Sequence, residues 1–264
     1  MSLLAGGNTA ARSAREKRFH DEVDIRVENR KVHVRLSHVF ASPNTQRAWR
    51  SLDAITARCV RGARVLDFGC GKGASSRRLA ALGAAAVDGI DISSRCIEAA
   101  RMGAPGPYRF FEHDAHLPLP ERYDVIFGKA ILHHLDYREV LPRLARDNLT
   151  PGGRMIFVEP LGENVLMRIY WRLGQRFHTP DERPFRRADL RWLEQTFPGF
   201  ELIPFNYASL LAGIVSSFVF RRPDNGLMRA CDRLDQRLAR LDWFRPRFRS
   251  AIFQIPAPTT PPPA

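Results

Sequence analysis

The sequence predicts an α/β fold: a doubly wound, mostly parallel sheet of seven strands with helices on both faces. Three observations point to it. Short apolar runs alternate with helical segments between residues 63 and 160, three alternating glycines follow the first run, and two more apolar runs lie near the C-terminus. Strands that alternate with crossover helices pair in parallel, and the helices cover both sides of the sheet.

The apolar runs are the expected strands. They are RVLDF (64–68), AAVDGID (85–91), YRFFE (108–112), YDVIFG (123–128), GRMIFVEP (153–160), FELIPF (200–205) and SAIFQI (250–255). Helical segments such as SSRRLAALG (75–83) and SRCIEAARMG (94–103) separate the first of them. This spacing predicts crossover helices between parallel strands.

After residue 160 the alternation loosens. A helix is predicted over 164–177, with Leu166, Tyr170, Leu173 and Phe177 on one face, and it must end at the two prolines of HTPDERP. Further along, leucines and a cysteine recur at steps of four and three, which predicts a helix with one apolar stripe. These residues are Leu227, Cys231, Leu234, Leu238 and Leu241.

Composition narrows the class of protein. The four cysteines, at positions 59, 70, 96 and 231, lack C-x-x-C spacing, which favours a reducing compartment and no structural zinc. The start of the chain lacks a secretory pattern, and the longest apolar stretch (207–220) is shorter than the roughly 20 residues that span a bilayer. We expect a cytoplasmic protein. The formal charge of +13 permits an anionic partner but is equally typical of an arginine-rich, solvated surface.

The glycine-rich stretch VLDFGCGKG (65–73) is a candidate ligand-binding loop. It does not fit the phosphate-binding G-x-x-x-x-G-K-[ST] pattern, because Gly73 follows Lys72. Gly69, Gly71 and Ala74 formally meet the dinucleotide pattern G-x-G-x-x-[GA]. Asp67, two residues before the first glycine, argues against the dinucleotide pattern, since dinucleotide-binding strands usually carry an apolar residue there. A third class of ligand is therefore considered.

Five segments in order carry a family resemblance. They are D-x-G-x-G-x-G (67–73), GIDIS (89–93), HDA (113–115), YDVIFGKAILHHL (123–135) and LTPGG (149–153). Together they resemble the class I S-adenosylmethionine-dependent methyltransferases, with their Rossmann-like fold. The continuation EPLGEN and the FHD at 19–21 are similar to a subgroup that methylates small molecules and lipid precursors, although Val165 stands where proline is usual.

The resemblance implies roles for individual residues. The loop of Gly69, Gly71 and Gly73 would pass beneath the methionine and ribose of S-adenosyl-L-methionine, with Asp67 as an orienting acceptor. Asp91, followed by Ile92, would accept hydrogen bonds from the ribose hydroxyls; the alternative is a helix N-cap. Asp114 and the backbone of Ala115 would bind adenine, unless Asp114 is an ordinary loop residue. Lys129 and Ala130 would face the reacting methyl group, with the Lys129 side chain directed to solvent or to the acceptor.

Histidines are the candidate catalytic residues. His133 and His134 stand at the mouth of the expected site, where either could act as a base; a purely structural role at a helix start is the alternative. His20 and His178 are weaker candidates, on segments able to close over the site. His113 and His116 flank Asp114, but no further ligand cluster lies near them in sequence, so we expect no metal.

The predicted organisation has five parts. An N-terminal helical extension (1–62) precedes the cofactor-binding core (63–160), and an inserted lid or acceptor segment (161–199), C-terminal strands with an amphipathic helix (200–255) and a tail (256–264) follow. The expected activity is methylation of oxygen or carbon on a small-molecule or lipid-like acceptor with an acidic group, because arginines 168, 172 and 176 recur four residues apart. Peripheral contact with an anionic membrane is compatible with this. A nucleic-acid methyltransferase and a non-catalytic binding protein are the alternatives.

Overall fold

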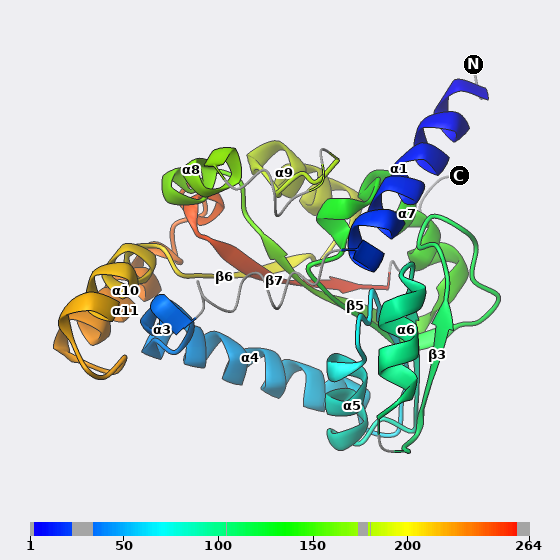
Figure 1. Cartoon of the computed structure of the whole chain (residues 1–264), viewed down its shortest axis with the longest axis horizontal. Coiled ribbons are helices and arrows are strands. Elements are labelled where there is room, and N and C mark those ends of the chain that lie inside the picture. Colours follow the sequence, from blue (N-terminus) through cyan, green and yellow to red (C-terminus); the bar gives the residue numbers. More distant parts are fainter. Residues whose placement is uncertain (1–2, 23–33, 104, 174–178, 180, 258–264) are drawn as a thin grey trace.

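One seven-stranded sheet organises the molecule (Figure 1). The computed structural model describes residues 3–22, 34–103, 105–173, 179 and 181–257. The strands are β1 (Arg64–Phe68), β2 (Ala86–Asp91), β3 (Tyr108–Glu112), β4 (Tyr123–Lys129), β5 (Leu149–Pro160), β6 (Glu201–Phe205) and β7 (Ser250–Pro256). Their order across the sheet is β3-β2-β1-β4-β5-β7-β6, and β7 runs antiparallel to both β5 and β6. The predicted fold class is confirmed.

The described helices surround this sheet. They are α1 (Leu3–Glu22), α3 (Ser37–Phe40), α4 (Pro43–Val60), α5 (Ala74–Ala81), α6 (Ser94–Arg101), α7 (Tyr137–Arg143), α8 (Val165–Leu173), α9 (Arg187–Thr196), α10 (Ala208–Val219) and α11 (Gly226–Leu238). Helices α4 and α5 pack on one face, whereas α7 and α9 pack on the other. The order of the strands reverses between β1 and β4, which is where open α/β sheets bind ligands, beyond the carboxyl ends of the strands.

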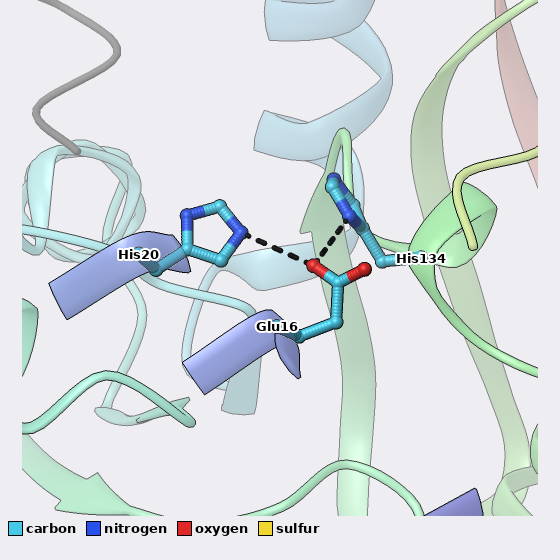
Figure 2. Close-up of side chains that lie close together, drawn as sticks. All are labelled: Glu16, His20 and His134. Atoms are coloured by element: carbon cyan, nitrogen blue, oxygen red, sulfur yellow. Dashed lines mark hydrogen bonds and ion pairs between the residues drawn. The ribbon is translucent and has the colours of Figure 1, made fainter. Parts of the chain in front are cut away.

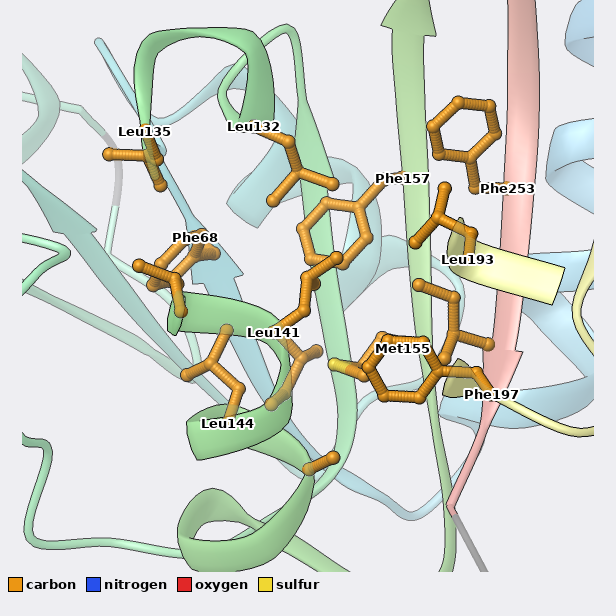
Figure 3. Packing of buried hydrophobic residues seen from close by; sticks show 14 of the residues in the cluster. Phe68, Leu132, Leu135, Leu141, Leu144, Met155, Phe157, Leu193, Phe197 and Phe253 are labelled. Carbon is orange, nitrogen blue, oxygen red and sulfur yellow. The ribbon is translucent and has the colours of Figure 1, made fainter. Parts of the chain in front are cut away.

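Alternate residues of each central strand enter opposite halves of the core. In β5, Met155 and Phe157 point into the cluster that α7 and α9 cover, while Ile156 and Val158 point into the cluster beneath α4 and α5. Figure 3 shows the first cluster, in which Phe68 of β1 meets the Phe157 ring edge to face. A strand buried on both faces is mostly apolar, which is why β1 and β5 show little alternation of polar and apolar residues at Val65, Leu66 and Phe68 and at 155–158.

The region after β5 departs from the sequence predictions. Helix α8 accounts for the first part of the predicted helix, and its predicted members Arg176 and Phe177, together with His178, lie outside the described residues. Helix α11 ends before Leu241, and it buries Met228 and Asp235, whereas Leu227, Leu234 and Leu241 are exposed. The predicted apolar stripe is therefore not the buried face of α11. Among the described residues, no helix combines the length and the apolar character that crossing a bilayer requires.

Candidate active site

The glycine loop joins β1 to α5 and turns through left-handed backbone at each glycine. A side chain at Gly69 would meet Ile131 at 2.8 Å, and one at Gly73 would meet the Phe110 ring at 2.7 Å, so both positions require glycine. Asp67, just before the loop, is fully buried, and its carboxylate accepts a hydrogen bond from the Ser76 hydroxyl at 2.5 Å. Asp67 therefore fastens the start of α5 to the end of β1 rather than facing the cavity described below.

Asp91 ends β2 with its carboxylate directed across the loop. The Gly71 N–H donates to Asp91 Oδ2 at 2.8 Å and the Ser93 N–H donates to Oδ1 at 2.9 Å. The N-cap of α6 is Ser93, whose hydroxyl accepts from the Cys96 N–H, so the N-cap alternative for Asp91 is wrong. With two backbone donors fixing it, the carboxylate still has lone pairs for a ligand.

Asp114 follows β3 and is held in a small polar network. Its Oδ1 accepts from the His116 backbone N–H at 2.9 Å and lies 3.0 Å from His116 Nδ1, and the Ser13 hydroxyl lies 3.3 Å from the same nitrogen. Burial alone would raise the pKa of Asp114, but the hydrogen bonds from His116 and Ser13 outweigh it and hold that pKa well below its usual range. Asp114 is therefore an ionised acceptor.

These loops surround an open cavity of about 460 Å³ at the carboxyl edge of β1, β2 and β4. That volume falls within the range of small-molecule sites, roughly 300–1,000 Å³. The predicted residues that line it are Gly69, Gly71, Asp91, Ile92, Asp114, Ala115, Lys129 and His134. Asp67, Gly73 and His133, which the sequence analysis grouped with them, are not part of the lining.

At the floor of the cavity β4 ends in a strained turn. Ala130 has a left-handed backbone with φ of 55°, which is unfavourable for any residue with a side chain. The N–H groups of Ile131 and Leu132 donate to Glu159 Oε1 at 3.0 and 2.9 Å and hold the turn in place. Lys129, beside Ala130, directs its ammonium group over the Trp49 ring at 4.3 Å.

The two adjacent histidines after β4 have different surroundings. His133 is buried beneath the turn, with Nδ1 2.7 Å from Glu159 Oε2, and its ring meets that of Trp171 edge to face. His134 lines the cavity. The structure thus brings His134, and not His133, to the place where a substrate could reach it.

His134 belongs to a cluster with two residues of α1 (Figure 2). Its Nδ1 lies 3.0 Å from Glu16 Oε2, and Nε2 of His20 lies 3.6 Å from the same oxygen. The Thr179 hydroxyl donates to the other oxygen of Glu16, and Glu182 Oε1 is 3.7 Å from His134 Nδ1. Helix α1 therefore supplies one wall of the cavity, through Ser13, Glu16 and His20.

The side chains of this cluster have pKa values that are shifted in different directions. Burial alone would raise the pKa of Glu16, but hydrogen bonds from His134 and His20 hold it well below its usual range. Burial would lower the pKa of His20, yet Glu16 and the charge of Asp91 raise it above its ordinary value. Burial and repulsion from His133 lower the pKa of His134. Near neutral pH, Glu16 is thus ionised and His134 is neutral.

Sequence reasoning missed Glu16 and Glu159. Glu16 stands 118 residues before His134, so no local spacing could connect them. Three ligand atoms, one each from Glu16, His20 and His134, lie within 4.8 Å of one another, as do those of His133, His134 and Glu182. Groups of this kind can bind a cation, and their members are too far apart in the sequence to be recognised there, so the absence of a metal remains a prediction.

Comparison with known proteins identifies the central region. Residues 65–153 match the family described as "Methyltransferase domain". A "Ribosomal protein L11 methyltransferase" of Thiobacillus denitrificans is 31% identical over 160 residues, 58% of this chain and 51% of that protein. A "Ubiquinone biosynthesis O-methyltransferase" of Azoarcus sp. is 33% identical over 133 residues, 48% of this chain and 56% of its own length. The chain thus spans about half the length of these curated relatives.

Solved structures share the fold across most of the chain. A magnesium protoporphyrin IX methyltransferase from Synechocystis PCC 6803 with bound SAH has a TM-score of 0.54 and 16% identity, covering 93% of this chain and 99% of that one. Geranyl diphosphate C-methyltransferase from Streptomyces coelicolor A3(2) has a TM-score of 0.55 and 12% identity, covering 81% and 80%. At such low identity these similarities establish the fold alone.

Proposed function

We propose that this chain, whose residues 65–153 form a methyltransferase domain of the class I S-adenosylmethionine-dependent family, transfers a methyl group from S-adenosylmethionine to a small-molecule acceptor. The observation that carries the proposal is the cavity at the edge of β1, β2 and β4. Its lining includes the ionisable acceptors Asp91 and Asp114 and a neutral histidine, His134, that is paired with the carboxylate of Glu16.

The residues present fit the cofactor. Added atoms at Gly71 would meet nothing within 4 Å, so the backbone at the centre of the loop is open to a ligand. Asp91 would accept hydrogen bonds from the two ribose hydroxyls, and Asp114 with the Ala115 backbone would bind the adenine. S-adenosylmethionine would supply an electrophilic methyl group, and the remaining contribution of the chain is to align the acceptor and remove its proton.

We infer that His134 is the residue that accepts this proton. Its Nδ1 is occupied by Glu16, which leaves Nε2 as the nitrogen with a free lone pair when the ring is neutral. A lowered pKa keeps the ring neutral and able to take a proton from a hydroxyl or an acidic carbon. Oxygen or carbon methylation follows from this choice of base, since both require deprotonation of the acceptor.

The acceptor itself is constrained less closely. The two curated relatives are named for different roles, one for a ribosomal protein and one for ubiquinone biosynthesis. The arginines of α8 suggested an acidic acceptor, but Arg168 and Arg172 are exposed and neither lines the cavity. An acidic, lipid-like acceptor would therefore have to extend from the cavity towards α8 to reach them.

Two variants of neighbouring histidines test the catalytic assignment. His134→Gln should lower turnover by about 100-fold or more, the usual contribution of a general base, while leaving the affinity for S-adenosylmethionine unchanged. His133→Gln is the matched control, because His133 does not line the cavity, and it should retain most of the turnover once stability is matched. Equal losses in both variants would assign the pair to structure.

Cofactor binding is tested by removing the negative charge of Asp91. Asp91→Asn should weaken the binding of S-adenosylmethionine, measured by calorimetry, by about 1.5–3 kcal/mol, the range for hydrogen bonds to a charged group.

The class of acceptor is tested by labelling. When the protein is incubated with methyl-labelled S-adenosylmethionine and fractionated cell extract, the label should enter the small-molecule or lipid fraction. Label in RNA or protein would contradict the acceptor class, and binding without transfer to any fraction would favour a non-catalytic protein.

A further inference from the structure

Helix α10 turns most of its large apolar side chains away from the protein, unlike an ordinary surface helix. The side that faces the protein is made mostly of small residues, several of them polar, with Leu210 as its large buried side chain; the small ones include Ser209, Ala212, Gly213 and Ser216. Most of the other large apolar residues point outward. Surface helices of globular proteins usually bury their apolar face, so packing among the described residues does not explain the outward face of α10.

Specific contacts fix this orientation. A side chain at Gly213 would come within 2.9 Å of the Val39 backbone, so α10 lies tightly against α3. The Ser216 hydroxyl is 2.9 Å from His38 Nδ1, and the Ser209 hydroxyl donates to the buried Asp235 at 2.5 Å. Rotating α10 to bury its large residues would break these polar contacts between buried groups, which is unfavourable.

The outward face is continuous and apolar. Leu211 is 54% exposed, Val215 45%, Phe218 64% and Val219 66%. Positions 211, 215, 218 and 219 recur at the spacing of one helical face, and α10 contains no charged residue. An exposed patch of large apolar side chains on one helix marks a surface that a membrane or another molecule covers.

Positive charge surrounds this face. Arg221 and Arg222 follow α10 after Phe220 and are exposed, as are Arg229 and Arg233 on the neighbouring α11. Of the nearby carboxylates, Asp224 is paired with Arg229, Asp232 is paired with Arg47 and Asp235 is buried, so the excess positive charge beside this face comes from Arg221, Arg222 and Arg233. A second copy of this chain that covered the face through its own α10 would bring the same exposed arginines against these, and like charges repel. An anionic bilayer offers both the apolar layer and the opposite charge.

We propose that the outward face of α10, flanked by these arginines, docks onto a membrane surface that contains anionic lipid. The helix lies in the plane of the interface with its apolar side chains among the acyl chains, and the arginines contact phosphate groups. Helix α10 leaves β6, which is parallel to β5 and β4, at the carboxyl edge of the sheet. The docking face and the cavity thus belong to the same edge. The proposal does not depend on the methyl-transfer reaction.

Vesicle binding by the full chain tests the proposal. The chain should co-sediment with vesicles of phosphatidylcholine and phosphatidylglycerol, and much less with phosphatidylcholine alone. The double variant Phe218→Ser and Val219→Ser should lower the partition onto anionic vesicles by about tenfold or more, because two apolar side chains no longer leave water. Met102→Ser with Val165→Ser is the matched control, since Met102 and Val165 are equally exposed apolar residues on other elements, and it should bind as the parent chain does.

Other results would overturn the proposal. Failure of the parent chain to bind anionic vesicles, or equal binding by the parent and the α10 variant, would exclude α10 as a membrane contact. A parent chain that elutes as a dimer, ignores vesicles and becomes monomeric in the α10 variant would show that a second copy covers this face. Circular dichroism spectra and melting temperatures of the variants confirm that each still folds.

Discussion

At the scale of the residue, Glu16 determines how His134 behaves. The carboxylate opposes the burial and the His133 repulsion that lower the pKa of His134. Removing the negative charge in Glu16→Gln should therefore let the pKa of His134 fall further and leave a weaker base that is less firmly oriented. We expect turnover to fall by about 10- to 100-fold, less than the loss of the base itself.

The pH profile distinguishes this effect from a general loss of structure. Activity should rise with pH as His134 loses its proton, and in Glu16→Gln the midpoint of that rise should move to lower pH. Turnover measured from pH 5 to 9 at saturating substrate gives both midpoints. An unchanged midpoint with reduced turnover would mean that Glu16 acts only by holding α1 in place.

Asp67 makes the stability of the protein depend on pH. Burial raises its pKa to about 7, with the Ser76 hydroxyl opposing the rise and Asp91 adding to it. Between about pH 4 and 7 the folded chain thus holds a proton that the unfolded chain has lost, so the free energy of unfolding falls as pH rises through this window.

Replacing Asp67 with asparagine should remove that dependence. Urea unfolding at pH 5 and pH 8 should show the parent chain losing more stability than Asp67→Asn between the two values, by more than about 1.4 kcal/mol, the equivalent of one pKa unit. Asp242→Asn is the control, because Asp242 is exposed, and it should follow the parent chain. Parallel curves for the parent chain and Asp67→Asn would show that Asp67 is ionised at both values.

Residue positions were predictable where neighbouring strands bring groups together. Asp91, Asp114 and the glycines lie at the ends of consecutive strands, and parallel pairing alone gathers such positions at one edge of the sheet. Glu16 and Glu159 were not predictable, because their partners come from distant elements and a single acidic residue in a helix or a strand carries no signal of burial. Asp67 was recognised as distinctive, but its partner, Ser76, became visible only once α5 was placed.

At the scale of the element, α1 contacts several of the segments that surround the cavity. Lys17 Nζ lies 2.5 Å from a Glu112 oxygen and 3.0 Å from the Ile92 carbonyl oxygen, while Asp21 accepts from the Ser93 hydroxyl at 2.6 Å. On the opposite side, Glu16 contacts His134 and Thr179. The helix thus contacts the loops after β2 and β4 together.

Deleting residues 1–22 should therefore impair both binding and transfer. We expect weaker affinity for S-adenosylmethionine and a loss of turnover of about 100-fold or more, since the partner of His134 is removed with one wall of the cavity. Arg15→Gln is the matched control within α1: its ion pair with Asp181 is surface-exposed, and such pairs contribute only about 0–1 kcal/mol. Normal turnover in the truncated chain would exclude α1 from the active site.

The helices were less predictable than the strands. Periodicity located α11 but predicted its buried side only in part, because Met228 and Asp235 are its buried residues and Leu238 is the one predicted leucine that packs against the core. The apolar run of α10 does not by itself indicate which side is buried: the inner contacts are made largely through glycine, alanine and serine, with Leu210, while other large apolar residues are exposed. Hydrophobic pattern predicts that a helix forms, but the shape of the neighbouring element determines which face it buries.

At the scale of the whole molecule, the seven strands and the reversal of their order followed from the alternation of apolar runs and helices. The order of the last two strands did not. A short strand between two helices can pair at either edge of a sheet, and only the pairing of β7 with β5 places β6 at the outside. The net charge likewise did not predict which partner the chain binds, because that depends on where the arginines lie relative to α10.

The position of β7 also determines the order in which the strands can pair as the chain folds. Strand β6, completed at residue 205, pairs in this sheet only through β7, which spans Ser250–Pro256. During synthesis from the N-terminus, the first five strands can pair as they emerge, but β6 has to wait for about fifty more residues, with α10 already formed and its apolar face exposed. Nascent chains stalled before residue 250 should therefore be the species that chaperones bind most, and any truncation within β7 should release two strands from the sheet rather than one.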